Sequence, residues 1–240
     1  MKEKTVTLLL VLGILLLGRG FLQRVEQEQS IAITTDADSR RLPVVVLDAG
    51  HGGKDPGKVG QGEVLEKDIN LCIAFRLKSL LEQNNVLVVM TREEDKDLAS
   101  EQAVSRKNED LRARAKLVEE ALPDVMVSIH QNSYPEEDVN GAQTFFYSGS
   151  TKGKQLAAMI QESLKRELKD GNHRVAKANK EYYLLKKASC AAVIVECGFL
   201  SNPAEAALLS TQEYQEKLAF AIHLGIMEYI NTVKGMEEQR

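Results

Sequence analysis

The sequence predicts an α/β fold in which helices cover both faces of a mostly parallel, twisted sheet. Apolar runs rich in β-branched residues are typical of strands buried on both faces. Such runs occupy residues 44–47, 86–90, 125–129 and 191–195. Amphipathic helical patterns alternate with these runs, and that order is typical of a parallel sheet with crossover helices. We therefore expect one domain built around a single sheet.

The helices follow from the spacing of apolar residues. Residues 66–83 place Ile69, Ile73, Leu77, Leu80 and Leu81 on one face of a helix, and Asn84 follows the pattern. By the same criteria we expect further helices at 110–121, 154–169, 203–209 and 213–230, and further strands at 141–147 and 182–185.

The first 42 of the 240 residues differ in composition from the rest of the chain. Residues 1–22 combine a charged start with an apolar run at 5–17, which is typical of an export segment. The run is short for a membrane span of about 20 residues, but no clear cleavage site follows, so we favour an uncleaved anchor. We expect a polar linker at 23–42, the catalytic domain at 43–233 and a polar tail at 234–240.

Composition excludes several classes of function. A net charge of -4, without a cluster of basic and aromatic residues, argues against binding of nucleic acid. Cys72, Cys190 and Cys197 form no disulfide framework, and we expect them to be buried thiols. The chain also has neither a Gly-x-Ser-x-Gly elbow nor a phosphate-binding loop.

Chemically active residues follow the apolar runs. His51, His130 and Glu196 each come after a predicted strand, and Glu66 begins the first long helix. Because the carboxyl ends of parallel strands meet at one edge of the sheet, we expect these four side chains to lie together. Two imidazoles and a carboxylate can hold a catalytic Zn²⁺, and a further glutamate can take a proton from water. Taken singly, each histidine could instead be a hydrogen-bonded loop residue, and Glu196 could be a member of a structural ion pair.

Other titratable residues fit this site less well. His173 lies in a charged loop and His223 on a helix, and we expect both to be structural. Cys197 follows Glu196 and should point to the opposite face of its strand, because side chains alternate along a strand.

The motifs LDAGHGGKDPG, LEKDIN, SIHQNS and VIVECGFLSNP together resemble those of the zinc-dependent N-acetylmuramoyl-L-alanine amidases of bacterial cell walls. The resemblance covers about residues 44–230. It implies that His51, Glu66 and His130 are the zinc ligands and that Glu196 is the catalytic glutamate. Glu63 is a nearby alternative ligand, but Glu66 stands directly before KDIN as the ligand of the family does. At position 49 the family usually has proline, and this chain has alanine.

A narrower resemblance is to the germination-specific amidases of spore-forming bacteria. It rests on the export segment, the absence of wall-binding repeats and the segment VSRKNEDLRARAKLVEE. It implies action on spore-cortex peptidoglycan, as a step toward muramic-δ-lactam, during cortex maturation and germination. It also implies an extracytoplasmic enzyme, anchored at the cell or forespore envelope, for which a lipoprotein partner is possible.

The expected reaction is hydrolysis of the amide between the lactyl group of muramic acid and L-alanine. Asn132 and Tyr134 follow His130 and could line the substrate groove, while Arg92 could meet a peptide carboxylate. Two alternatives stay open: a zinc hydrolase that cuts within the peptide stem, and a non-catalytic wall-binding regulator on the same fold. Retention of all four site residues argues against the regulator.

Overall fold

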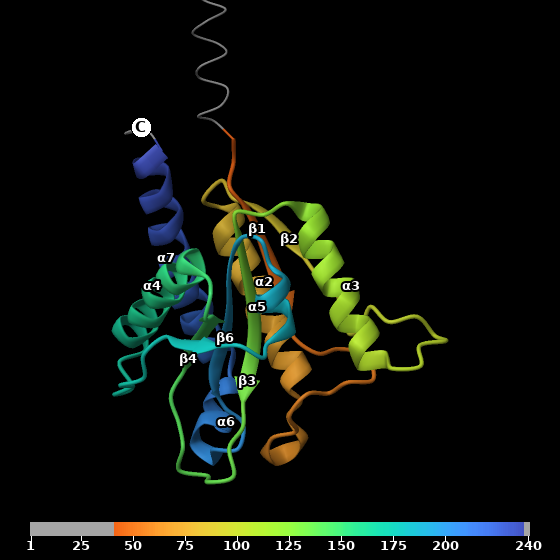
Figure 1. The fold of residues 1–240 in the computed structure, drawn as a ribbon. Coiled ribbons are helices and arrows are strands. Elements are labelled where there is room, and N and C mark those ends of the chain that lie inside the picture. Colours follow the sequence, from red (N-terminus) through yellow and green to blue (C-terminus); the bar gives the residue numbers. More distant parts are fainter. Residues whose placement is uncertain (1–40, 238–240) are drawn as a thin grey trace, which may run out of the picture. The chain divides into compact units, whose positions relative to one another are not determined.

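The computed structural model describes residues 41–237, which form one six-stranded sheet and the helices around it (Figure 1). The strands are β1 (Val44–Ala49), β2 (Leu87–Met90), β3 (Val125–Asn132), β4 (Gln143–Tyr147), β5 (Lys177–Asn179) and β6 (Ala191–Phe199). The helices are the 3-10 turn η1 (Gln61–Glu63), α2 (Glu66–Glu82), α3 (Arg106–Ala121), α4 (Thr151–Leu168), α5 (Tyr183–Lys187), α6 (Pro203–Leu209) and α7 (Gln212–Glu237).

The predicted fold class is confirmed. The strand order is β2-β1-β3-β6-β4-β5, and the first four of these strands are parallel. Strand β4 pairs with β6 antiparallel, and β5 pairs with β4 parallel, so these two strands run opposite to the other four. Strands β1, β3 and β6 therefore lie side by side and end at the same edge of the sheet.

Each face of the sheet has its own apolar core. Residues at alternate positions of β1, β3 and β6 join α2, α4 and α7 in the larger core, for example Leu47, Ile129 and Val195. The intervening residues, such as Val46 and Ile194, pack with α3 and α5. Alternation along the strands thus decides which side chains face α3 and α5.

Two strands run further than the apolar pattern predicts. Strand β3 continues to Asn132 and β6 to Phe199, so His130 and Glu196 lie within strands. These two residues are register partners on adjacent strands. The rigid sheet, rather than a loop, therefore sets their spacing.

The predicted strand at 182–185 is wrong, because this segment forms helix α5. Leu184 and Leu185 are consecutive and both buried in the same core, whereas strand geometry would send them to opposite faces. The backbone N–H groups of Lys186 and Ala188 donate to the carbonyls of Tyr182 and Leu184, which closes helical turns.

Several smaller predictions also need correction. Helix α3 begins at Arg106, four residues before its predicted start at 110, and α7 continues through Glu237, into the predicted polar tail. Strand β5 has no counterpart among the predicted elements. Cys72 is exposed rather than buried, because it lies on the outer face of α2, while Cys197 is buried as predicted.

The predicted anchor at 1–22 lies outside the described residues, as does nearly all of the predicted linker. Within residues 41–237, no helix is long and apolar enough to span a membrane. The division of the chain into anchor, linker, domain and tail stays a prediction.

A buried ion pair joins β1 to α3. Asp48 is 1% exposed, and its Oδ1 accepts hydrogen bonds from Arg114 Nη1 at 2.7 Å and Thr91 Oγ1 at 2.8 Å. Ser128 Oγ donates to the other carboxylate oxygen. Burial raises the pKa of Asp48, but Arg114 and Ser128 outweigh that effect and hold it at about 2. Arg114 is also bonded to Asp110, so its buried charge is compensated twice.

Arg114→Met should destabilise the fold by about 3–5 kcal/mol, because it leaves the Asp48 carboxylate buried without its cation. Urea denaturation at neutral pH measures this loss. The matched control is Arg112→Met on the same helix, where the side chain is exposed and the expected change is within about 0.5 kcal/mol.

The pH dependence of stability in wild type and in Arg114→Met tests the same ion pair. The pKa of Asp48 is lower in the folded protein than its ordinary value of 3.8, so its stabilising contribution is complete above that value. The contribution is lost as the pH falls toward 2. The difference in stability between wild type and Arg114→Met should therefore narrow below pH 3.8, and a difference that stayed constant would contradict the pairing.

Candidate active site

His51 lies in the loop that follows β1. Its backbone conformation is unfavourable by itself and is stabilised by contacts with other parts of the chain. Its φ is 62°, a left-handed value that residues with a Cβ rarely adopt. Arg114 Nη2 donates to the carbonyl of His51 at 2.7 Å, and Arg114 Nη1 donates to that of Ala49 at 2.8 Å. Arg92 Nη2 donates to the carbonyl of Gly50 at 3.2 Å. Two buried guanidinium groups thus hold three consecutive carbonyls.

Glu66 brings the two histidines together. Its Oε1 lies 3.2 Å from His51 Nε2 and 3.0 Å from His130 Nδ1. The backbone N–H of Gln131 donates to the same oxygen at 3.0 Å, and that of Lys58 donates to Oε2 at 2.7 Å. The carboxylate is therefore held by the backbone on both of its oxygens.

His51, Glu66 and His130 form a potential metal-binding triad. One ligand atom from each lies within 4.8 Å of the others, and no second such group occurs in residues 41–237. Burial raises the pKa of Glu66, but hydrogen bonds from both histidines lower it well below its usual range. Burial lowers the pKa of His51, yet Glu66 and Asp55 raise it to about 9. Both shifts arise because the Glu66 carboxylate lies against the imidazoles, and two imidazoles with a carboxylate are a donor set that suits a divalent cation.

Asp55 is a site residue that the sequence analysis missed. Its Oδ2 lies 2.8 Å from His51 Nδ1. A proton donated from Nδ1 leaves Nε2 of His51, which faces Glu66, as the ligand atom. Metal-binding histidines commonly donate their other ring N–H to a carboxylate in this way. The available signal was an acidic residue four positions after His51 in the same glycine-rich loop.

Two glycines leave space for the ligand side chains, because a Cβ at either position would overlap with them. A Cβ on Gly50 would lie 2.2 Å from Cε1 of His130. Gly57 has a φ of +67°, and a Cβ there would lie 2.5 Å from Oε2 of Glu66. Both positions therefore require glycine for the three ligand side chains to approach one another.

Glu196 lies beside the triad on the α3 and α5 side of the sheet. It is the register partner of His130 and is 7% exposed. Burial, followed by the charge of Glu66, raises the pKa of Glu196 despite the nearby His130. Its Oε1 accepts a hydrogen bond from the hydroxyl of Tyr182 at 3.3 Å, and its Oε2 has no hydrogen-bond partner in the described part of the chain. A buried carboxylate with a free oxygen and a raised pKa suits proton transfer.

The three residues predicted to contact substrate differ in how exposed they are. Asn132 is half-buried at the end of β3, and Tyr134 is exposed after it, with its N–H bonded to Ser201. Both remain available to a ligand. Arg92 is 1% exposed and donates to the carbonyls of Ala49, Gly50, Lys67 and Glu94, so it is a structural residue and not a contact for a peptide carboxylate. Glu63 is exposed and lies outside the triad.

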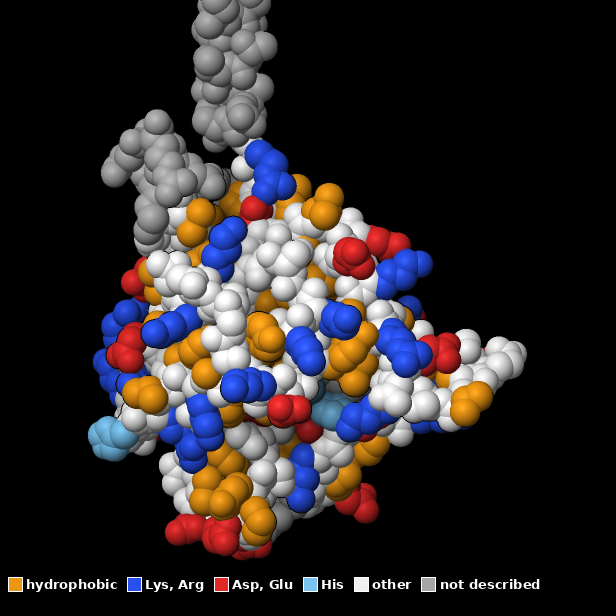
Figure 2. All heavy atoms as spheres, viewed as in Figure 1, with side chains coloured by type: hydrophobic (Ala, Val, Ile, Leu, Met, Phe, Trp, Pro, Cys, Tyr) orange, Lys and Arg blue, Asp and Glu red, His pale blue; other side chains and the backbone are white. Residues whose placement is uncertain are grey.

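The surface around the site is mixed in charge. Figure 2 shows histidine atoms within a recess, with an acidic side chain beside them and several Lys and Arg side chains around the rim. His51 and His130 have side chains that are 19% and 22% exposed, so a ligand can reach them from solvent. His173 and His223 lie outside this cluster, as predicted.

Proteins of known activity are similar to this chain in sequence and in fold. The sequence pattern of the N-acetylmuramoyl-L-alanine amidase family matches residues 45–228. The germination-specific N-acetylmuramoyl-L-alanine amidase of Bacillus subtilis (strain 168) is 43% identical over 195 residues, covering 80% of this chain and 81% of that protein.

Solved structures agree with this match. The CwlD amidase from Clostridioides difficile, solved in complex with the GerS lipoprotein, is 40% identical, with a TM-score of 0.77 over 79% of this chain and 99% of that one. The catalytic domain of CwlV, an amidase from Bacillus (Paenibacillus) polymyxa var. colistinus, is 31% identical, with a TM-score of 0.70 over 79% of this chain and 99% of that one. The chain therefore belongs to the N-acetylmuramoyl-L-alanine amidase family.

Proposed function

We propose that this amidase is zinc-dependent and hydrolyses the amide between the lactyl carbonyl of muramic acid and L-alanine in spore-cortex peptidoglycan. The observation that carries the proposal is the cluster of His51, Glu66 and His130 with Glu196 as the next side chain along the sheet edge. Two imidazoles and one carboxylate are the ligand set of catalytic zinc sites, which keep a further position for water or substrate. These three residues would hold the ion.

Each protein group has a separate task in this reaction. A zinc ion held by these residues would supply a Lewis acid that makes water acidic enough to act as a nucleophile near neutral pH. Glu196 takes a proton from the attacking water at its free Oε2 as the water oxygen bonds to the lactyl carbonyl carbon, and it delivers that proton to the nitrogen of L-alanine as the C–N bond breaks. The raised pKa of Glu196 favours holding the proton between these two steps. Asp55 holds the ring of His51 in the tautomer that the metal needs.

Asn132 and Tyr134 are proposed to contact the glycan or the peptide. They follow His130 at the same sheet edge, and neither side chain is buried. The carbonyl of Asn132 accepts from the N–H of Leu200, which fixes this segment next to the end of β6. A polar amide and an aromatic ring suit a sugar and peptide substrate.

The biological setting is proposed from the relatives. Similarity to a germination-specific amidase supports cortex peptidoglycan as the substrate, with muramic-δ-lactam as the eventual product. The complex of CwlD with the GerS lipoprotein supports a lipoprotein partner for this chain too. Because peptidoglycan lies outside the cytoplasmic membrane, we place the enzyme there, exported and anchored by residues 1–22.

His130→Ala should abolish stoichiometric zinc binding, because it removes one of three protein ligands. Elemental analysis of the purified full chain measures the zinc content. His173→Ala is the control, since His173 is exposed and outside the triad. Full zinc content in His130→Ala would show that the ligands are assigned wrongly.

Asp55→Asn should weaken zinc binding by about 10- to 100-fold, because the amide no longer orients His51 as the carboxylate does. Competition with a chromogenic chelator gives the affinity. Asp138→Asn, at an exposed position in another loop, is the control. Equal affinity in both variants would remove Asp55 from the site.

Glu196→Gln should lower turnover by at least about 10²-fold while the fold and the zinc content survive, because the amide cannot accept the proton. Amide cleavage, thermal melting and zinc content are measured on one preparation. Glu181→Gln, an exposed glutamate next to Tyr182, is the control and should behave as wild type. Near-normal cleavage by a folded, zinc-loaded Glu196→Gln protein would overturn the mechanism.

A further inference from the structure

Tyr182 reaches the candidate active site from outside the motifs that define it. Its hydroxyl donates to Oε1 of Glu196 at 3.3 Å. Its ring meets that of Phe145 edge to face, with centroids 5.6 Å apart and an interplanar angle of 81°. The side chain is half-buried, so the ring is held by packing on β4 while the hydroxyl faces the carboxylate.

The backbone of Tyr182 is fixed as firmly as its ring. Asn179 Oδ1 accepts hydrogen bonds from the N–H groups of Glu181 at 2.7 Å and Tyr182 at 2.9 Å. The carbonyl of Asn179 accepts from Ser148, which ties the end of β5 to the end of β4. The carbonyl of Tyr182 accepts from Lys186 in the first turn of α5. The hydroxyl is therefore presented from a rigid segment.

The two oxygens of Glu196 have different surroundings. Oε1 has the phenol as its partner, whereas Oε2 is buried without a hydrogen-bond partner within residues 41–237. Burial and the charge of Glu196 raise the pKa of Tyr182, so the phenol keeps its proton and donates it to the ionised carboxylate in a hydrogen bond. A carboxylate that is bonded at one oxygen is restricted in rotation about its last torsion. The other oxygen then points in one direction.

We propose that Tyr182 is a positioning residue for Glu196: it holds Oε1 so that Oε2 faces the reacting water. This inference rests on the proposed role of Glu196 as the proton acceptor. Within residues 41–237, the side chain of Tyr182 has no hydrogen bond or ring contact with His51, Glu66 or His130, so it acts through the carboxylate of Glu196. Its removal therefore changes the rate of the chemical step and leaves binding of metal and substrate as they are.

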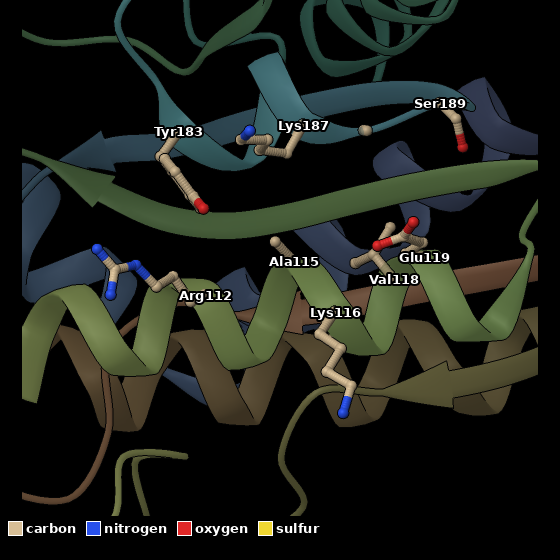
Figure 3. Close-up of a pocket in the computed structure, with 9 residues that line it drawn as sticks. Arg112, Ala115, Lys116, Val118, Glu119, Tyr183, Lys187 and Ser189 are labelled. Atoms are coloured by element: carbon tan, nitrogen blue, oxygen red, sulfur yellow. The ribbon is translucent and has the colours of Figure 1, made fainter. Parts of the chain in front are cut away.

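The adjacent tyrosine provides a matched control. Tyr183 is the first residue of α5 and directly follows Tyr182, but it points toward α3, where it lines a pocket of about 360 Å³ together with Arg112 and Lys187 (Figure 3). The Lys187 ammonium lies 5.9 Å from its ring centroid. Loss of either hydroxyl removes one oxygen at the start of the same short helix, but of the two tyrosines only Tyr182 is hydrogen-bonded to Glu196.

The experiment compares Tyr182→Phe and Tyr183→Phe in the full chain on a soluble N-acetylmuramoyl-peptide fragment. Tyr182→Phe should lower kcat about tenfold, because a hydrogen bond to a charged group is lost. Its KM, zinc content and melting temperature should stay at the values of wild type. Tyr183→Phe should match wild type in all four quantities. A merely structural Tyr182 would instead lower the melting temperature and spare kcat per folded molecule.

The double variant separates this inference from the proposed function. On the background of Glu196→Gln, adding Tyr182→Phe should cause no further loss, because the hydroxyl acts only through the carboxylate. An inactive Glu196→Gln protein with fully active Tyr182→Phe would overturn the positioning role and leave the function of Glu196 intact. An active Glu196→Gln protein would overturn the function itself. A further loss in the double variant would show that Tyr182 acts by another route.

Discussion

The candidate site depends on two buried arginines that hold the backbone of the loop after β1. Arg92 and Arg114 together donate to the carbonyls of Ala49, Gly50 and His51. A guanidinium group presents several donors in one plane, so each arginine can bond more than one carbonyl and keep their spacing fixed. The left-handed φ of His51 is maintained by these bonds rather than by the preference of the residue.

The charge of Arg114 is neutralised inside the fold. Asp48 lies on the same face of the sheet as His130 and Glu196, and it compensates Arg114 together with Asp110. Removal of one partner from a buried ion pair is costly, because the other charge stays uncompensated. The stability of the domain and the placement of His51 are therefore linked. A substitution at Arg114 should affect both, although its side chain touches none of the ligand side chains.

Sequence reasoning predicted the parts of the site that depend on periodicity. Apolar runs followed by His130 and Glu196 indicated parallel strands, and the two residues lie together on adjacent strands as register partners, a finer relation than the one expected. Sequence periodicity did not predict the direction of individual side chains or the contacts between residues far apart in the sequence. Asp55 bonds His51 within a loop that no periodic pattern describes. The roles of Arg92 and Arg114 depend on hydrogen bonds to residues more than forty positions away, and an amphipathic pattern does not show these.

Tyr182 illustrates the same limit on a smaller scale. Residues 182–185 are too few for period 2 and period 3.6 to be distinguished, and the aromatic and aliphatic side chains favoured a strand. Packing of consecutive leucines into one core decided in favour of a helix. Tyr182 lies directly before this helix, and its hydrogen bond to Glu196 is a long-range contact that no periodic pattern shows.

The central claim is that this site cleaves the bond between muramic acid and L-alanine and leaves the peptide stem intact. Mass spectrometry of purified cortex and vegetative peptidoglycan, digested with zinc-loaded and zinc-stripped protein, tests it most directly. The zinc-loaded protein should release whole stem peptides that begin with a free L-alanine amine, leave muramic acid with a free lactyl carboxyl group, and act preferentially on cortex material. Shortened stems still attached to muramic acid, with no free L-alanine amine, would contradict the claim.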